Sequence, residues 1–233
     1  MKKYIVKNIP RPSKDMLDAY RSLDVSTVYE AQEKTGLMLP YLRPISPGQK
    51  IVGPAVTVIC PPEDNLMVHA AIEVCQPGDI LVITTTTGNY IGGMIGELIV
   101  TALIKRGIQG VVIDSATRDV ERLRELGFPV WTREIYSNGT FKRKGGWVNT
   151  PANCAGQIVR GGDLIMADED GVVVVKTENL AATLESANKR MEKEAGVKEK
   201  IAAGILSMDF HDLRGILKEQ DVVYVDNITD IKE

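Results

Sequence analysis

Apolar, strand-like runs alternate with helix-like segments through the middle of the chain, and this alternation limits the fold more than any other feature. Three short apolar runs predict buried strands: residues 51–60, 79–85 and 110–115. Three segments with helical character follow them: residues 66–74, 95–107 and 120–126. Strands that alternate with helices in this way form a parallel sheet covered by helices. The sequence therefore predicts an α/β fold.

Two shorter helices are predicted on the N-terminal side of this region. Ser13 is placed to cap a helix that ends near Tyr20, and Ser26 to cap another that runs to Gly36. The following residues 39–49 are rich in proline and glycine and predict a loop. The apolar face of the later helix 95–107 is expected at Leu98, Ala102 and Leu103.

The C-terminal part differs from the middle of the chain in its sequence pattern. The dipeptides Asn138-Gly139 and Gly145-Gly146 are turn signals and predict hairpins. Residues 163–176 predict a further hairpin, and residues 177–220 a charged helical arm. No linker composition separates these parts, so we expect a single α/β domain over residues 1–233 that includes the arm.

Composition excludes several classes of protein. Lys and Arg number 28 against 31 Asp and Glu, a net charge of −3, whereas a dedicated nucleic-acid binder normally carries a basic stripe. The cysteines Cys60, Cys75 and Cys154 are odd in number and far apart, which argues against a disulfide framework or a zinc site. The most apolar window, 99–104, is too short to span a bilayer. We therefore expect a cytoplasmic protein that contacts neither nucleic acid nor membrane.

A glycine-rich loop at residues 84–98 follows the second predicted strand and leads into a helix. Glycine lets backbone amides approach a ligand closely, and a helix N-terminus attracts anions such as carboxylates. The spacing matches neither the dinucleotide fingerprint nor the P-loop. A glycine turn that only packs a helix on a strand explains the same residues equally well.

A second loop, at residues 114–119, follows the next strand, so both loops are expected at the same edge of the sheet. Its adjacent Arg118 and Asp119 offer an anion clamp and a metal ligand. Taken alone, a capping aspartate beside a solvated arginine explains them better. With Glu97, however, the two loops combine a cation, carboxylates and an anion site. That set suits a 2-oxo acid chelated to Mg²⁺ or Mn²⁺.

These residues lie in a longer stretch with a family resemblance. It reads GGMIGELIVTALIKRGIQGVVIDSATRDVERLRELGFPVW. The stretch resembles the family that contains the regulator of ribonuclease activity A and the class II 4-hydroxy-4-methyl-2-oxoglutarate aldolases. Further segments are similar to its 4-carboxy-4-hydroxy-2-oxoadipate aldolase branch, among them STVYEAQEKTG, YLRPISPGQKIVGPAVTV, PPEDNLMVHAAIE, ADEDGVVVV and LRGILKEQDVVYV. The helical arm favours the aldolases over the shorter regulators.

The resemblance implies a fold and an assembly. The fold is a layered β/β/α sandwich of the ribonuclease-regulator-like, swivelling phosphohistidine-domain-like type. The helical arm is expected to pack on a neighbouring subunit of a homotrimer or homohexamer, with active sites between subunits.

The resemblance also implies roles for individual residues. Mg²⁺ or Mn²⁺ is expected to bind directly to Asp119 and, through water, to Glu97 and to Glu194 from a neighbouring subunit. Substrate contacts are implied for Gly96, Leu98, Ile99 and Arg118. Contacts with the distal part of the substrate are implied for Glu30, Asn65 and His69. Without the resemblance, His69 reads as a structural residue and Glu194 as part of a solvated helix face. Glu97 departs from the aldolase branch, where aspartate is common.

The expected activity is metal-dependent cleavage of a 4-hydroxy-2-oxo di- or tricarboxylic acid to pyruvate and a second 2-oxo acid. Such chemistry belongs to the degradation of aromatic compounds, and oxaloacetate decarboxylation is an expected side activity. A protein-binding regulator of ribonuclease activity is the first alternative. An S-adenosylmethionine-dependent menaquinone methyltransferase is the second, supported by the glycine-rich loop alone.

Overall fold

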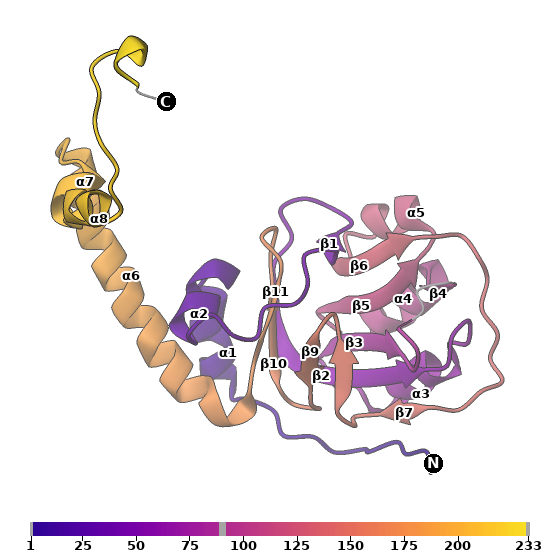
Figure 1. The fold of residues 1–233 in the computed structure, drawn as a ribbon. Coiled ribbons are helices and arrows are strands. Elements are labelled where there is room, and N and C mark those ends of the chain that lie inside the picture. Colours follow the sequence, from indigo (N-terminus) through magenta and orange to yellow (C-terminus); the bar gives the residue numbers. More distant parts are fainter. Residues whose placement is uncertain (1, 89–91, 232–233) are drawn as a thin grey trace. The chain divides into compact units, whose positions relative to one another are not determined.

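The computed structural model describes residues 2–88 and 92–231 (Figure 1). Their contacts divide the chain into two compact units, Met1–Ala187 and Asn188–Glu233. The division lies inside one long helix, α6 (Leu180–Ala202).

The first unit is built on a mixed sheet with four parallel strands at its centre. These strands are β2 (Ile51–Cys60), β3 (Ile80–Thr85), β5 (Gly110–Thr117) and β6 (Val130–Ile135), in the order β6-β5-β3-β2. The antiparallel strands β10 (Leu164–Ala167) and β11 (Val172–Val175) extend the sheet beyond β2, and the short β1 (Arg43–Pro44) pairs with β6. The three predicted buried strands are confirmed.

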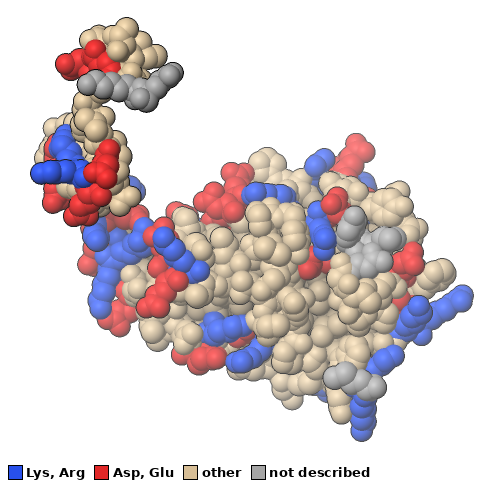
Figure 2. Space-filling model, viewed as in Figure 1, with Lys and Arg blue, Asp and Glu red and all other residues tan. Residues whose placement is uncertain are grey.

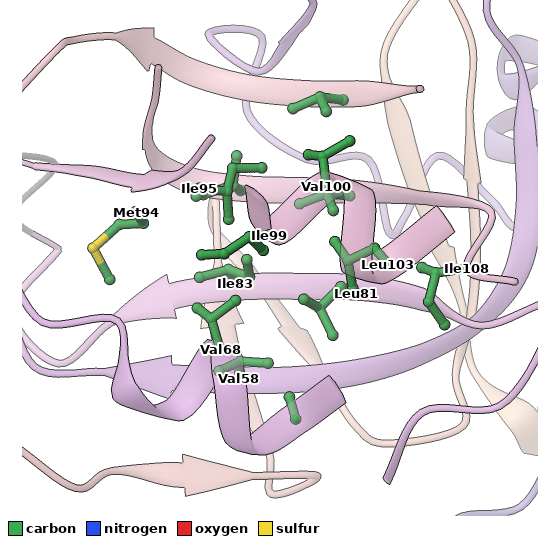
Figure 3. Close-up of a cluster of buried hydrophobic side chains, with 14 of the residues drawn as sticks. Val58, Val68, Leu81, Ile83, Met94, Ile95, Ile99, Val100, Leu103 and Ile108 are labelled. Carbon is green, nitrogen blue, oxygen red and sulfur yellow. The ribbon is translucent and has the colours of Figure 1, made fainter. Parts of the chain in front are cut away.

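Both faces of the parallel strands are covered, which explains their continuous apolar sequence. In β3, Leu81 and Ile83 point to one face and Ile80 and Val82 to the other, following the alternation of a strand. The first face packs against α3 (Leu66–Val74) and α4 (Glu97–Lys105), as Figure 3 shows. The short helix α5 (Val120–Glu125) completes that layer. The other face packs against the small hairpin β8 (Ala152–Cys154) and β9 (Gln157–Val159). The predicted layered α/β fold is confirmed.

The buried side of α4 differs from the prediction. Its buried residues are Ile99, Val100 and Leu103, whereas Leu98 is 85% exposed and Ala102 is also exposed. The helix is turned so that its first residues face solvent and the end of β5. Leu98 is therefore placed at a ligand-accessible position and not in the core.

The two N-terminal helices have mixed outcomes. In α1 (Lys14–Arg21), the Ser13 side chain accepts a hydrogen bond from the Met16 N–H, so the predicted cap is confirmed. The second helix, α2 (Val25–Ala31), begins directly after Asp24, whose side chain makes no capping hydrogen bond, so Ser26 lies within its first turn and is not the predicted cap. The helix ends five residues before Gly36. The chain turns after the helix, where Glu33 and Lys34 have positive φ, and Gly36 pairs with the sheet: the Val174 N–H donates to the Gly36 carbonyl at 2.9 Å.

The hairpins predicted around Asn138-Gly139 and Gly145-Gly146 are wrong. β6 pairs in parallel with β5, and β7 (Trp147–Val148) pairs with β2, so the chain between them crosses the sheet instead of reversing on itself. An unforeseen hairpin joins β8 and β9 through Ala155 and Gly156, both with positive φ. The predicted hairpin at 163–176 is confirmed as β10 and β11.

The second unit is helical, as predicted. After the end of α6 it contains α7 (Ser207–Phe210), α8 (Leu213–Glu219) and the 3-10 turn η2 (Ile228–Asp230); a similar turn, η1 (Thr177–Asn179), precedes α6 in the first unit. Across residues 2–88 and 92–231, no helix combines the length and apolar character needed to cross a membrane. On the face drawn in Figure 2, acidic and basic side chains of the described residues are interspersed, without a continuous basic stripe.

Candidate active site

A pocket of about 240 Å³ lies in the first unit, beside the carboxyl end of β5. Four segments line it: the start of α3, the short strand β4 (Gly93–Ile95) with the first turn of α4, the end of β5, and the loop after β6. The lining residues are Asn65, His69, Gly93, Met94, Ile95, Gly96, Glu97, Leu98, Ile99, Arg118, Asp119, Gly139, Thr140 and Lys142. The two predicted loops therefore meet at one pocket. Residues 89–91 of the glycine-rich loop lie outside the described residues.

A larger, more open depression of about 670 Å³ lies elsewhere in the first unit. Residues at the other ends of α3 and α4, including Glu73 and Arg106, line it. It contains none of the predicted site residues, so the smaller pocket is the candidate site.

Asp119 connects the end of β5 to the beginning of α4. It has a left-handed backbone (φ 56°) at the position before α5, but its side chain makes no capping bond to that helix. Its Oδ2 accepts a hydrogen bond from the Glu97 N–H at 3.1 Å. The simpler interpretation of Asp119 as the side-chain cap of α5 is therefore wrong, because the carboxylate faces the positive end of α4.

Gly96 makes this approach possible. A Cβ atom at Gly96 would lie 2.3 Å from Asp119 Oδ2, closer than real contacts allow. The backbone of Gly96 is extended (φ −158°), so any residue could adopt its conformation. Glycine is therefore required at position 96 because a Cβ atom has no room beside Asp119, and not because the backbone conformation needs glycine.

The Arg118 guanidinium lies open to the pocket. Its backbone N–H donates to the Ile95 carbonyl at 3.0 Å, which fixes the main chain. The guanidinium Nε is 3.8 Å from Asp119 Oδ2, and the side chain is 42% exposed. A structural pairing with the buried Asp114 is absent, because Asp114 instead contacts Arg133 and accepts the Ala155 N–H. The N–H donors of Arg118 are thus available to a ligand.

The first turn of α4 offers backbone donors beside Arg118. The first amides of any helix lack an intrahelical acceptor. Asp119 satisfies the Glu97 amide, and the next two amides belong to Leu98 and Ile99, which also line the pocket. The Glu97 carboxylate is ion-paired, with Arg122 Nε 3.2 Å from Oε1.

The start of α3 contributes unpaired polar atoms. The Asn65 side chain is buried and donates to the Met94 carbonyl at 2.9 Å, while its Oδ1 has no partner among the described residues. His69 Nε2 is also buried without a described partner. Burial lowers the pKa of His69, and the positive charge of Lys142 lowers it further. Near neutral pH the imidazole is therefore largely uncharged.

Lys142 is a pocket residue that sequence reasoning missed. It belongs to a basic run in the loop after β6, and nothing local in that run distinguishes it from a solvated lysine. Two predicted residues are placed differently from the others. Glu30 lies on α2 and is not among the lining residues. Glu194 belongs to the second unit, where Arg190 Nε is 2.9 Å from its Oε1.

The carboxylates of the pocket suit a hard divalent cation. Within the described residues, no three His, Cys, Asp or Glu side chains are grouped to hold a metal ion. Glu97 and Asp119 line the same pocket, and their side chains are 40% and 42% exposed. Mg²⁺ commonly binds one or two carboxylates and keeps its other positions for water and substrate. The oxygen donors present fit that mode and do not fit a closed structural site.

The first unit is a layered α/β domain whose pocket combines an arginine and carboxylates with a helix N-terminus. The chain belongs to the RraA-like family, whose model, described as Aldolase/RraA, matches residues 15–174. The family resemblance and its fold are thereby confirmed.

The relatives carry two kinds of name. The chain is 28% identical over 194 residues to a "Putative 4-hydroxy-4-methyl-2-oxoglutarate aldolase" of Halalkalibacterium halodurans, covering 83% of this chain and 92% of the relative. It is 30% identical over 164 residues to a protein of the same name from Burkholderia multivorans, covering 68% and 97%. Among solved structures, Streptomyces coelicolor RraAS2, "an unusual member of the RNase ES inhibitor RraA protein family", is 26% identical with a TM-score of 0.74, covering 82% and 99%.

Proposed function

We propose that the chain is a divalent-metal-dependent lyase that releases pyruvate from a 4-hydroxy-2-oxo di- or tricarboxylic acid. Candidate substrates are 4-hydroxy-4-methyl-2-oxoglutarate and 4-carboxy-4-hydroxy-2-oxoadipate. The observation that carries the proposal is the meeting of the Arg118 guanidinium, the Asp119 carboxylate and the first amides of α4 in one pocket. The aldolase names of relatives at 28% and 30% identity support it.

Arg118 and α4 bind the carboxylate next to the 2-oxo group. The guanidinium donates two parallel charge-assisted hydrogen bonds, and the amides of Leu98 and Ile99 donate from the helix end. Asp119 would hold Mg²⁺ or Mn²⁺, and Glu97 and a neighbouring subunit's Glu194 would hold water beside the ion. The bound ion supplies Lewis-acid polarisation of the 2-oxo group.

The chain's residues then assist one carbon–carbon cleavage. The C4 hydroxyl loses its proton to water held by Glu97, and its oxygen forms the carbonyl of the second 2-oxo acid. The C3–C4 bond breaks, and its electron pair becomes the enolate of pyruvate. Arg118 offsets the negative charge of that enolate. A proton delivered to C3 completes pyruvate. Oxaloacetate gives the same enolate by losing CO₂, so its decarboxylation is expected as a side activity.

The α3 side of the pocket binds the distal end of the substrate. Asn65 Oδ1 and His69 Nε2 are buried atoms without a hydrogen-bond partner among the described residues, and Lys142 supplies a positive charge close to His69. A substrate hydroxyl and a second carboxylate satisfy these groups together. Glu30 is proposed as a further contact of the distal end of the substrate.

The proposed assembly is a homotrimer or homohexamer in which the second unit packs on a neighbouring subunit. Several large apolar side chains of that unit are exposed in the single chain, including Ile201, Leu206, Ile216, Val223 and Ile228. Exposed apolar residues in such number are typical of a surface that another protein covers.

A substrate panel tests the proposal. The purified chain is mixed with each candidate acid and with oxaloacetate, and pyruvate is followed by a coupled assay, with Mg²⁺, with Mn²⁺ and with EDTA. We expect metal-dependent pyruvate release from at least one 4-hydroxy-2-oxo acid. Absence of pyruvate from every acid at saturating metal would contradict the lyase function.

One comparison favours a second candidate, a protein-binding regulator of an RNA-degrading enzyme. The Streptomyces relative is described as a member of an RNase ES inhibitor family. Such a role does not need the pocket chemistry, so a double variant with Arg118→Ala and Asp119→Ala should still inhibit a ribonuclease. Inhibition by the double variant, with no lyase activity in the unmodified chain, would favour the regulator.

A further inference from the structure

The first turn of α5 contacts Glu97 at two points. Asp119 Oδ2 accepts the Glu97 backbone N–H at 3.1 Å, and Arg122 Nε lies 3.2 Å from the Glu97 carboxylate oxygen Oε1. Asp119 and Arg122 are three residues apart at the start of one helix, so they lie on the same side of it. A single helical turn therefore holds both the main chain and the side chain of Glu97.

Arg122 restricts a side chain that is otherwise free to move. Within the described part of the chain, Arg122 is the sole hydrogen-bond or ion-pair partner of the Glu97 carboxylate. An exposed glutamate samples several rotamers, and a charge-assisted bond from a guanidinium selects among them. Arg122 is itself held from the other side by an ion pair with Glu125.

The Glu97–Arg122 pair contributes little to stability. Its side chains are 40% and 54% exposed, and exposed pairs of this kind are weak. Its consequence is the orientation of a carboxylate that lines the pocket next to Asp119. Arg122 does not line the pocket, so it can act on the reaction only through Glu97 or through its own charge.

We propose that Arg122 is a positioning residue that orients the Glu97 carboxylate toward the water and the divalent ion held beside Asp119. The role rests on the proposed function for its effect on turnover. Its effect on metal affinity does not depend on which reaction is catalysed.

A double-mutant cycle in the whole 233-residue chain separates orientation from charge. The proteins are the unmodified chain, Arg122→Ala, Glu97→Ala and the double variant. The positive charge of Arg122 acts on the ion whether or not Glu97 is present, whereas orientation needs Glu97, so only orientation appears as non-additivity. Two quantities are measured: kcat and KM for pyruvate formation from oxaloacetate, and the Kd of Mn²⁺ by calorimetry.

We expect Arg122→Ala to lower kcat roughly 3- to 10-fold, at or below the cost typical of residues that orient metal ligands. KM for oxaloacetate should be unchanged, and Arg122→Lys should recover part of kcat. In the Glu97→Ala background, the same substitution should leave kcat unchanged, and Mn²⁺ affinities should be non-additive. The matched control is Arg160→Ala, because Arg160 and Glu178 form an equally long and somewhat more exposed pair outside the pocket. It should change neither quantity.

The outcomes distinguish the two proposals. Equal losses of kcat in both backgrounds, or additive Mn²⁺ affinities with an active unmodified chain, would overturn the positioning role and leave the lyase function standing. Non-additive Mn²⁺ affinities without any pyruvate formation would support the positioning role and overturn the lyase function. If Arg122→Ala does not fold, Arg122→Gln replaces it in the same cycle with the same expectations.

Discussion

Asp119 Oδ2 accepts the backbone N–H of Glu97 across 22 residues of sequence, at 3.1 Å. This bond ties the end of β5 to the first residue of α4. It also places a carboxylate, which is proposed to hold the metal, against the amides that are proposed to hold the substrate. The geometry of both depends on this one contact, and the first two predictions follow from it.

Gly96→Ala should disable the site while leaving the fold intact. The added Cβ would lie 2.3 Å from Asp119 Oδ2, so the carboxylate must move away from the helix end. We expect pyruvate formation to fall roughly 10- to 100-fold, as when a metal ligand loses its supporting contact. The control is Gly215→Ala in α8, where an added Cβ makes only ordinary contacts. A variant at Gly96 with normal activity and normal Mn²⁺ affinity would show that the Asp119–Glu97 contact is dispensable.

Asp119→Asn should separate the structural from the chemical role of this residue. Asparagine tolerates the left-handed backbone and can still accept the Glu97 N–H, but it carries no charge. We expect an unchanged thermal midpoint and loss of most activity, and Asp119→Ala should lose activity to a similar degree. Near-normal turnover of either variant in low-millimolar Mg²⁺ would contradict direct metal binding by Asp119.

Arg118→Lys should lower kcat/KM much more than stability. The lysine keeps the charge but loses the two parallel bonds of the guanidinium. Losing one charge-assisted bond costs about 1.5–3 kcal/mol, or about 10- to 150-fold in kcat/KM. Arg118→Ala should be worse, and both variants should unfold near the normal temperature because the side chain is 42% exposed. A lysine variant with unchanged kcat/KM on oxaloacetate would rule out bidentate binding.

Glu194 is predicted to complete the site of a neighbouring subunit. Mixed oligomers of Glu194→Ala and Arg118→Ala subunits should regain part of the activity that each lacks alone, because some sites then contain both normal residues. The control is each variant taken separately through the same dissociation and mixing. Proven mixed oligomers without recovery would mean that both residues act in one subunit's site or that Glu194 has no role.

His69 should make the protein less stable in mild acid. Its folded-state pKa lies below the ordinary value of 6.5, chiefly because of burial, so the unfolded chain binds the proton more readily. Above about pH 6.5 both states are neutral and His69 has no effect; as the pH falls below that value, protonation favours unfolding. Thermal midpoints at pH 7.5 and 5.5 should therefore differ more for the unmodified chain than for His69→Gln. Equal differences would show that the imidazole titrates as it does in water.

The central strands and helices of this fold could be predicted from the local pattern of apolar residues. The strands β2, β3 and β5 and the helices between them could be predicted because short, strand-length apolar runs alternate with longer helix-like segments. The pairing of β6 with β5 was not, because a turn dipeptide such as Asn138-Gly139 permits a hairpin without requiring one. The exposed position of Leu98 was also missed, since the sheet against which a helix packs decides which side of the helix is buried.

The candidate site divides in the same way. Arg118 and Asp119 could be chosen from their adjacency after a predicted strand, but their contact with the start of α4 is a property of the folded chain. Lys142 gave no signal, because its loop reaches the pocket only after β6 has joined the sheet. Glu30 and Glu194 came from family resemblance alone, and the single chain does not bring Glu30 to the pocket.

The pairing of Gly36 with Val174 has a consequence for the behaviour of the protein in concentrated solution. β11 is the last strand of the sheet on its side, and an exposed last strand can recruit a strand from another molecule. Here the Val174 N–H donates to Gly36 and the Val172 carbonyl accepts from Met38, so these main-chain groups are already engaged. A Cβ at Gly36 would lie 2.4 Å from the Val174 carbonyl oxygen, so only glycine lets the segment lie this close. The glycine thus lets this segment occupy main-chain groups of the last strand that a strand from another molecule would otherwise bind.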